Sequence, residues 1–396
     1  RVVTKTVNTQ LLSGKFNPST GTKVDFKRPH DYNSIRSAGG DISGADKSDI
    51  IAGKATGTVQ PYFTSATEWS NIQEALELDQ LDQILEPMAR RLVTDLELDL
   101  AKFMRINTGL NYGARGTAVD AWSDVAGAGA MMDSVGVPMS DNKYYLMNPF
   151  TTTSLASAQS GLNAADGLVR TAFEKAQIAS NFGGMKALTS NALSSYTSGT
   201  TTDRLGDLKT APDATYVTAK DTMQQTMVIE TLGTGTIEAG DQIQIAGVNR
   251  LNIATRQLIL DATGAAVPWT GTVLSVVTIA GNEATVVVSG AAIFEANGQY
   301  NNVDAAPAAG AVVTILGAAA TVYQPNLFYT EQAFGLGTVK LPKLYSTDTV
   351  ATTSDGMSIR VSKYSDGDAN TQKIRFDLLP AYACFNPNFA GQGYGV

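Results

Sequence analysis

Residues 70–109 carry the longest helical pattern in the chain, and the other elements have to be arranged around a helix of that length. Ser70 followed by Gln73 has the pattern of a capping box at its start, and Asn107 with Gly109 supplies stop signals at its end. Apolar residues recur at steps of three or four, which predicts one buried helix face: Leu81, Leu85, Met88, Leu92, Leu96, Leu100 and Phe103.

Pro87 interrupts this pattern, because proline has no backbone N–H and its ring collides with the carbonyl group four residues earlier. Two outcomes are open: a kink at this point, or a second helix that begins here. From Pro87 to Asn107 a helix would span about 30 Å at roughly 1.5 Å per residue. It would be either an ordinary amphipathic helix packed on a sheet or the backbone of a flat, plate-like subunit.

Residues 14–66 predict a long protruding two-stranded loop. Strand-like runs near Lys23–Lys27 and Gly57–Thr64 flank a segment rich in Gly, Ser, Ala and Asp. Such a segment is too polar to build its own core and too long for a tight turn. Because a two-stranded ribbon is only marginally stable alone in water, we expect this loop to dock on a partner. A disordered surface loop is the alternative.

From about Ser190 the sequence changes to Thr, Val, Gly and Ala with alternating polarity and regular turn signals. Gly281-Asn282 between two Val-rich runs predicts a hairpin. Mixed α/β sequence precedes this stretch and resumes after it, which predicts a small all-β barrel or sandwich inserted into an α/β unit. The end of the chain predicts a β-meander, in which Ile359 and Val361 share one face of a strand.

Charge argues against a sequence-independent grip on nucleic acid, because the formal net charge is −8. Residues 1–60 hold nine Lys/Arg against five Asp, a net charge of +4, so the remainder carries −12. A basic arm on an acidic body suggests contact with the body of a neighbouring subunit; a solvated basic tail is the alternative. Only 17% of residues are charged, which suits a protein that buries much of its surface against copies of itself.

The residue types that carry most enzyme chemistry are scarce. His30 is the only histidine and Cys384 the only cysteine, so neither a disulfide within the chain nor a cysteine metal cluster is expected. Neither a P-loop motif nor a strand-to-helix GxGxxG is present. An oxygen-only cation site at residues 366–370 lacks the terminal glutamate of a calcium loop, which favours an ordinary turn. We predict no catalytic residue, no cofactor and no metal.

A membrane is not an expected partner either. No apolar run reaches the ~18 residues that a transmembrane helix needs, and no signal peptide is visible.

Four short motifs follow one another at characteristic places: AVDAW at residues 118–122, YYLMNP at 144–149, GDQIQIAGV at 240–248 and NLFY at 326–329. In their order and spacing the chain resembles the major capsid proteins of tailed bacteriophages. More closely, it is similar to the coat proteins of short-tailed Salmonella-type phages, which carry an extra insertion domain. The resemblance extends from about residue 70 to the end and is weakest in residues 1–66.

The resemblance implies an α+β fold, the tailed-phage major capsid fold, with an inserted all-β barrel domain. Its parts would be the N-terminal arm (1–13), the extended loop over a neighbouring subunit (14–66), the peripheral domain with the spine helix (67–117 and 356–396), the axial domain (118–190 and 322–355) and the inserted barrel (191–321).

The function that this implies is a structural major capsid protein, which self-assembles into the icosahedral shell enclosing a double-stranded DNA genome without binding the DNA specifically. The expected partners are copies of the chain in hexamers and pentamers, together with scaffolding and portal proteins. Assembly would take place in the bacterial host cytoplasm, and the product would be the virion capsid. A tail or fibre protein is the alternative, and a carboxylate-dependent hydrolase is a third. Charged residues of the loop are the candidates for contacts between subunits: Lys27, Arg28, Arg36, Asp41, Asp46 and Asp49.

Overall fold

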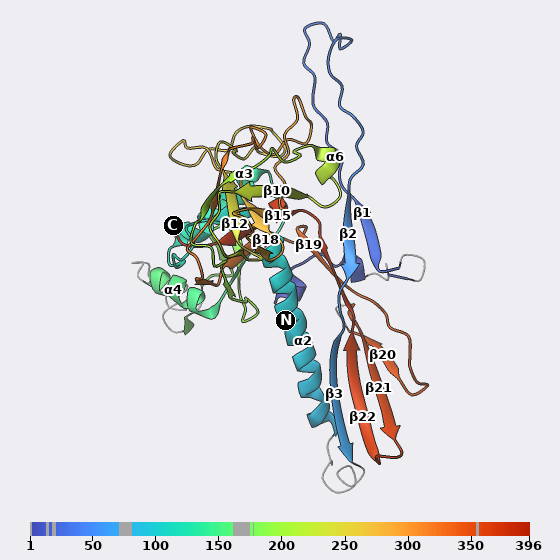
Figure 1. The fold of residues 1–396 in the computed structure, drawn as a ribbon. Coiled ribbons are helices and arrows are strands. Elements are labelled where there is room, and N and C mark those ends of the chain that lie inside the picture. The colour runs from blue at the N-terminus through green and yellow to red at the C-terminus, as the bar shows by residue number, and fades with distance from the viewer. Residues whose placement is uncertain are drawn as a thin grey trace. The chain divides into compact units, whose positions relative to one another are not determined.

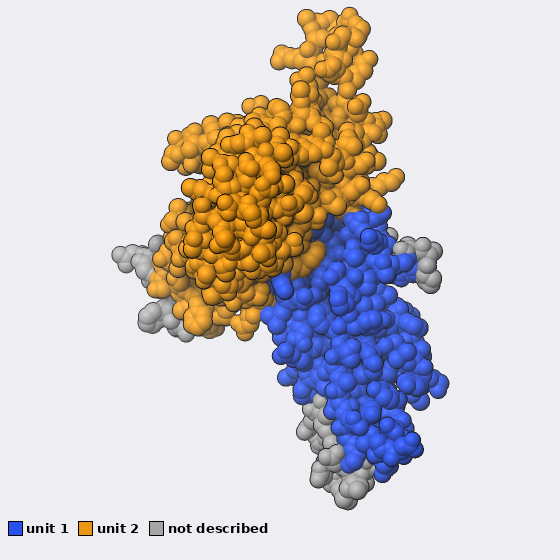
Figure 2. All heavy atoms as spheres, in the orientation of Figure 1, with its two compact units in different colours: residues 1–26, 56–102, 334–385 blue, residues 27–55, 103–333, 386–396 orange. Residues whose placement is uncertain are grey.

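The computed structural model of this chain describes residues 2–12, 16–17, 21–70, 81–160, 175–176, 178–353 and 356–396. The chain divides into two compact units, which Figure 2 colours separately. Unit 1 comprises residues 1–26, 56–102 and 334–385, and unit 2 comprises residues 27–55, 103–333 and 386–396. Both units contain helical segments and sheets, so the fold is α+β as predicted.

Unit 1 is built from two four-stranded sheets and most of the long helix α2 (Figure 1). The strand orders are β1-β2-β23-β19 and β20-β21-β22-β3. The elements are η1 (Val3–Lys5), η2 (Gln10–Leu12), β1 (Lys23–Lys27), β2 (Lys54–Val59), β3 (Phe63–Ser70), α2 (Leu81–Ile106), β19 (Phe334–Thr338), β20 (Thr349–Thr352), β21 (Ser358–Asp366), β22 (Thr371–Leu378) and β23 (Pro380–Cys384). The strand predicted at Lys23–Lys27 is confirmed, whereas the predicted run Gly57–Thr64 is divided between β2 and β3.

Helix α2 is a single helix that contains Pro87. The alternative of a second helix beginning at Pro87 is therefore wrong. Proline removes one hydrogen bond from the ladder, whereas a new helix would need a new and unfavourable nucleus. Ser70 is the last residue of β3, and Gln73, the other half of the predicted capping box, lies outside the described residues.

The predicted apolar face of α2 varies in depth along the helix. Leu92, Leu96 and Leu100 are buried, with 2%, 0% and 0% of their surface exposed. The remaining members differ: Leu85, Met88 and Phe103 are half-buried, and the side chain of Leu81 lies outside the described part of the chain. In the last turn the fully buried residue is Met104, because it continues the row of positions four apart that Leu92, Leu96 and Leu100 begin.

The N-terminal segment packs on unit 1 of its own chain. Val3, Val7 and Leu11 are buried. The Asn8 N–H donates to the Phe334 carbonyl (2.9 Å), and the Leu336 N–H donates to the Asn8 carbonyl (3.0 Å). These bonds add the segment to the edge of β19, so its order comes from contacts within the chain.

The buried face of β21 is polar. It consists of Ser358, Arg360 and Ser362, while Ile359 and Val361 are half-buried on the other face. Arg360 donates to Oδ2 of Asp377 through Nε (3.2 Å) and through its terminal nitrogen (2.6 Å).

Asp377 receives two further donors on its other oxygen. Arg375 donates to Oδ1 at 3.0 and 2.6 Å, and the Thr64 hydroxyl donates to it at 2.8 Å. Burial raises the pKa of Asp377, but the hydrogen bonds from Arg375, Arg360 and Thr64 outweigh that effect, so the pKa lies below its usual value. Asp377 thus provides the negative charge that the buried Arg360 needs.

Unit 2 contains a six-stranded sheet of order β4-β24-β18-β5-β7-β6 and a closed six-stranded barrel of order β10-β15-β13-β12-β16-β9. The helical elements of unit 2 that the structure describes in full are α3 (Trp122–Val135), α4 (Pro149–Ser160), α6 (Tyr216–Ala219) and η3 (Pro387–Phe389). The strands of the sheet are β4 (Leu110–Tyr112), β5 (Lys143–Met147), β6 (Asn181–Phe182), β7 (Met185–Thr189), β18 (Asn326–Thr330) and β24 (Ala390–Gly393). The strands of the barrel are β9 (Leu205–Leu208), β10 (Gln224–Glu230), β12 (Gln242–Ile245), β13 (Gly271–Val273), β15 (Ala284–Ser289) and β16 (Val312–Ile315). Two short pairs complete the unit, β8 (Tyr196–Thr197) with β17 (Val322–Tyr323) and β11 (Thr236–Ile237) with β14 (Val277–Thr278).

The barrel encloses an apolar core, because alternate residues of each strand face inward. Met227 and Ile229 of β10 and Val286 and Val288 of β15 are buried in one cluster with Trp269. The predicted hairpin turn is confirmed next to β15. Gly281 and Asn282 both have positive φ (61° and 64°), and Ala280 and Glu283 exchange backbone hydrogen bonds.

Replacing Asp377 by Asn is expected to remove a pH-dependent part of the stability of unit 1. A carboxyl group whose pKa is depressed on folding contributes stability above its unfolded pKa of about 3.9, and this contribution is lost as pH falls through the folded pKa. At pH 7, Asp377→Asn should lower the free energy of unfolding by about 3–5 kcal/mol, because Arg360 stays buried without its counter-charge. Urea unfolding from pH 7 to pH 3, followed by tryptophan fluorescence, measures both effects.

Asp368→Asn is the matched control for this change, since Asp368 is exposed in the turn after β21. The free energy of unfolding of Asp368→Asn should stay within about 0.5 kcal/mol of that of the wild type. Equal midpoints for the two variants at pH 7 would contradict the role assigned to Asp377.

Candidate functional site: a loop anchored on unit 2

Residues 28–53 connect β1 to β2 and contain no helix or strand, although the structure describes all of them. Figure 1 draws this segment as two long, extended pieces of chain joined at a tip. It belongs to unit 2, and we call it the loop; residues 31–35 and 46–51 are its flanks, and residues 36–45 are its tip. The sequence predicts a two-stranded loop over residues 14–66; in the structure the strands β1 and β2 flank residues 28–53, which themselves contain no strand.

The base of the loop is closed by hydrogen bonds. The Arg28 N–H donates to the Gly53 carbonyl (2.9 Å), and Arg28 Nε donates to the Lys54 carbonyl (3.1 Å). Gly53 is required here, because a Cβ atom would lie 2.8 Å from the Lys220 carbonyl oxygen and 2.9 Å from the Tyr216 hydroxyl. The Lys54 N–H also donates to the Asp221 carboxylate (3.2 Å).

One apolar contact supports the returning flank. Ile51 and Tyr300 both pack against a buried cluster that contains Tyr216, Met223 and Ile293. The rings of Tyr216 and Tyr300 are stacked, with centroids 3.7 Å apart. The Tyr300 hydroxyl also accepts the Asp31 N–H (3.3 Å), so this cluster touches both flanks.

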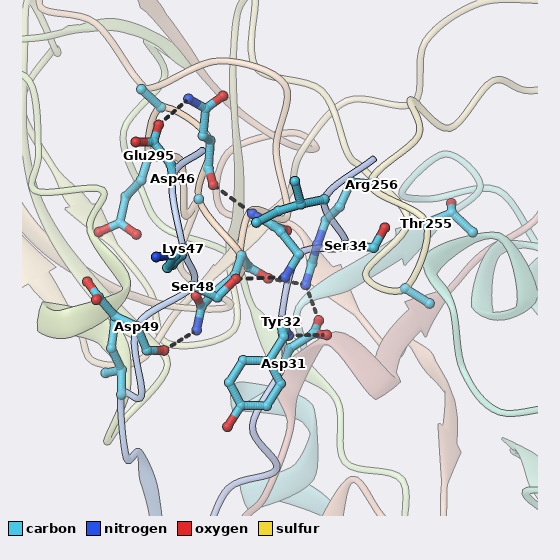
Figure 3. A pocket seen from close by; sticks show the side chains of 18 of the residues that line it. Asp31, Tyr32, Ser34, Asp46, Lys47, Ser48, Asp49, Thr255, Arg256 and Glu295 are labelled. Carbon is cyan, nitrogen blue, oxygen red and sulfur yellow. Dashed lines mark hydrogen bonds and ion pairs between the residues drawn. The ribbon is translucent and has the colours of Figure 1, made fainter. Parts of the chain in front are cut away.

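Polar contacts fasten both flanks to two turns of unit 2 (Figure 3). Arg256 forms an ion pair with Asp31 and also donates to the Gln299 carbonyl. Asn297 accepts from the Asn33 side chain through its carbonyl (2.7 Å) and donates to the Asp46 carboxylate (3.3 Å).

Two further bonds complete these contacts. The Gln299 side chain donates to the Asp49 carbonyl (2.6 Å), and within the loop the Asn33 N–H donates to the Ser48 hydroxyl (2.8 Å). Burial lowers the pKa of Arg256, and the neighbouring Asp31 acts in the opposite direction.

These contacts surround an open cleft of about 990 Å³. The lining comes from both flanks, from Val217, from residues 254–256 and from residues 295–299. Most of the lining side chains are polar. The flanks are therefore fastened around an open cleft with a mostly polar lining.

The six predicted contact residues fall into different environments. Lys27 is exposed at the end of β1, and Arg28 is half-buried at the base of the loop. Asp46 is bonded to Asn297, whereas Asp49 takes part through its carbonyl group. In the tip, Arg36 and Asp41 are exposed. The Asp41 carboxylate accepts the Ser43 N–H (2.9 Å), which lowers the pKa of Asp41.

Sequence reasoning missed the residues that receive the loop. Arg256, Asn297 and Gln299 lie more than 200 positions along the chain from their partners Asp31, Asp46 and Asp49, as the sequence separations of 225, 251 and 250 show. The only local signal is an Asn-Gly pair at 297–298, which indicates a turn and says nothing of a partner.

Two buried arginines join the barrel to the six-stranded sheet within unit 2. Arg115 donates to Gln242 of β12 (3.1 Å) and to Gln392 of β24 (3.0 Å), and it also bonds to the Tyr196 hydroxyl. Asp241 lies 3.9 Å from Arg115 and 3.9 Å from Arg204, and accepts the N–H groups of residues 199 and 238 at 3.0 Å each. One buried carboxylate thus balances two guanidinium groups.

Arg250 is the second of these arginines. The groups that accept its hydrogen bonds, among the described residues, are neutral. It donates to the Thr270 carbonyl (2.8 Å), to the Asn388 side chain (3.2 Å) and to the Gly109 carbonyl. Burial lowers the pKa of Arg250 to about 9. Arg250 therefore links three segments: the residue before β4, the residue before β13 and the segment that precedes β24.

In the part of the chain that the structure describes, no cluster of His, Cys, Asp and Glu is arranged to hold a metal ion. Among the same residues, no helix is both long enough and apolar enough to cross a membrane.

Comparison with known proteins decides the family. The family model described as P22 coat protein, gene protein 5, matches residues 1–395. The chain belongs to the P22 coat protein family. A relative described as a major capsid protein, from Acyrthosiphon pisum secondary endosymbiont phage 1, is 48% identical over 399 residues, covering 100% of this chain and 94% of the relative. The resemblance drawn from the four short motifs is confirmed.

One solved structure agrees at the level of the fold. A structure titled Mycobacterium phage Che8 aligns with a TM-score of 0.50 at 11% identity, over 99% of this coat protein and 90% of that chain. The capsid structure of the cyanophage P-SCSP1u aligns with a TM-score of 0.48 at 13% identity, over 99% of this chain and 86% of that one. As a member of the P22 coat protein family, the chain is a structural component of a phage capsid and not an enzyme.

Asp241→Asn should destabilise unit 2 by about 3 kcal/mol, because it leaves the buried Arg115 and the half-buried Arg204 without a counter-charge. Urea unfolding measures the loss through the fluorescence of Trp269, which is fully buried in the barrel core. The control is Asp203→Asn, an exposed carboxylate between residues 199 and 204, expected to change the free energy of unfolding by less than about 1 kcal/mol. A wild-type midpoint for Asp241→Asn would contradict this role.

Proposed function

We propose that this coat protein assembles with copies of itself into hexamers and pentamers that form an icosahedral shell around double-stranded DNA, and that the loop makes contact between neighbouring copies. The observation that carries the proposal is the exposed tip. Every residue from 36 to 44 is exposed, including Ile42, with 42% of its surface accessible. A coreless, apolar-bearing tip on a capsid protein is suited to burial against a second copy.

The charges on the tip support a contact in which two copies meet in one defined alignment. Arg36 and Asp41 present opposite charges on the tip. Exposed pairs of this kind contribute about 0–1 kcal/mol each, so the strength of a shell would come from repetition and from apolar burial. Heterologous contacts close into rings when the rotation between copies allows it, and hexamers and pentamers are such rings.

The arrangement of domains is part of this proposal. The parts would be an N-terminal arm (1–13), an extended loop (14–66), a peripheral domain (67–117 and 356–396), an axial domain (118–190 and 322–355) and an inserted β-barrel domain (191–321). All six barrel strands fall between Leu205 and Ile315, which supports the last of these.

The remaining partners are proposed on chemical grounds. A net charge of −8 suits a shell that encloses DNA without holding it. Scaffolding and portal proteins would set the size of the shell and its entry point, and assembly would take place in the cytoplasm of the bacterial host.

Electron microscopy of the purified protein, alone and co-expressed with a scaffolding protein from the same genome, tests the proposal. Closed, uniform shells are the expected result under at least one condition. Tubes, fibres or a stable monomer under both conditions would contradict it.

A charge reversal in the tip, R36E/D41K, tests the part played by the loop. It should lower the yield of closed shells while leaving the urea midpoint of the unassembled protein unchanged, because the tip residues are exposed. A yield of closed shells equal to that of the wild type would contradict the proposal that the tip lies in the interface between copies.

A further inference from the structure

We propose that Arg256, Asn297 and Gln299 form a latch, which holds both flanks of the loop on unit 2 of their own subunit before copies meet. The tip is then presented to a neighbour from a support that is already ordered. This inference rests on the proposed function, since it describes how the assembly contact is prepared.

Both flanks are fastened to the turn at residues 297–299, and Arg256 holds the outgoing flank as well. Asp31 and Asn33 belong to the outgoing flank, and Asp46 and Asp49 belong to the returning flank. Their partners are Arg256 and residues 297–299. Arg256 also donates to the carbonyl groups of residues 299 and 301, so its guanidinium group ties the outgoing flank to the turn that receives the returning flank.

The backbone of two latch residues is held in a rare conformation. Arg256 and Asn297 both have a φ of 57°, in the left-handed region that an arginine rarely adopts. The Arg256 N–H donates to the Asn252 carbonyl (2.9 Å), and Asn252 Oδ1 accepts the N–H groups of residues 254 and 255 at 2.9 and 2.8 Å. The turn is therefore built in a way that fixes Arg256 in an otherwise unfavourable conformation, from which it reaches Asp31.

The tip has fewer contacts with the rest of unit 2 than the flanks have. A Cβ atom added at Gly39, Gly40 or Gly44 would meet nothing within 4 Å. The hydrogen bonds described within the tip join near neighbours, Ser43 to Asp41 and Ala45 to Ile42. The chain thus supports the flanks and leaves the tip free, which is the arrangement that a contact between copies needs.

The latch also has a physical advantage for assembly. Ordering a flexible segment at the moment of binding reduces affinity, and a segment ordered beforehand avoids most of that loss. Partly exposed ion pairs and hydrogen bonds beside an open cleft are individually weak. The latch therefore acts through the number of its contacts, with Ile51 as its one apolar support.

Hydrogen exchange of the unassembled full-length protein, read by mass spectrometry, tests the latch. In the wild type, peptides covering the flanks should exchange about tenfold more slowly than the tip peptide. Arg256→Gln should remove most of that difference and leave the barrel strands β10 and β15 as protected as before. Lys47→Gln, which changes another cation lining the same cleft, should leave the flanks protected.

A second variant covers the case in which Arg256→Gln disturbs the barrel. The exchanged pair D31R/R256D should restore flank protection toward that of the wild type, because it re-forms the ion pair with opposite orientation. Flanks that exchange as fast as the tip in the unassembled wild type would overturn the proposal. The proposal would also be overturned if the flanks of Arg256→Gln kept the wild-type protection from exchange, or if flank peptides became protected only in assembled shells.

The two proposals fail separately. A wild type that forms closed shells but has unprotected flanks would overturn the latch and leave the assembly function intact. A wild type with protected flanks that never forms shells would overturn the assembly function alone.

Discussion

A segment that cannot build a core of its own has to be ordered by contacts elsewhere, and residues 28–53 are such a segment. Their apolar contribution to a described cluster is Ile51 alone, and the remaining contacts are hydrogen bonds and an ion pair. The loop therefore depends on the turns that carry Arg256 and Asn297, and those turns depend on the stability of unit 2. This dependence connects the interior of unit 2 to the loop, which we propose makes contact between copies.

Unit 2 provides that stability through an apolar barrel core and through buried arginines. Arg115 bonds to both β12 and β24, and Arg250 bonds to carbonyl groups on either side of the same junction. A buried guanidinium group is costly unless its donors are satisfied, and its five donors can meet acceptors from several strands at once. The same chemistry recurs in unit 1, where Asp377 is shared by Arg360 and Arg375. Both units thus use buried guanidinium groups to join strands.

Local patterns in the sequence predicted much of the fold. The bounds of β1, the turn at Gly281-Asn282 and the long helix depend on neighbouring residues, and the structure agrees with all three. Features that depend on distant partners could not be predicted. The apolar pair Ile359 and Val361 marks one face of β21, yet the fully buried face is the polar one, because Asp377 on the next strand neutralises Arg360. Two of the six predicted contact residues, Asp46 and Asp49, bond to partners that lie 251 and 250 positions away, and no local pattern marks such partners.

In the proposed assembly each subunit keeps the flanks of its own loop and gives only the tip to a neighbour. An electron cryomicroscopy map of a shell assembled from the wild-type protein tests this directly, since the density can be traced through residues 28–53 of one subunit. Both flanks are expected to lie on the Arg256 and Asn297 turns of the subunit to which they belong, with residues 36–45 against the adjacent copy. Flanks seated on the turns of the adjacent copy would contradict this arrangement.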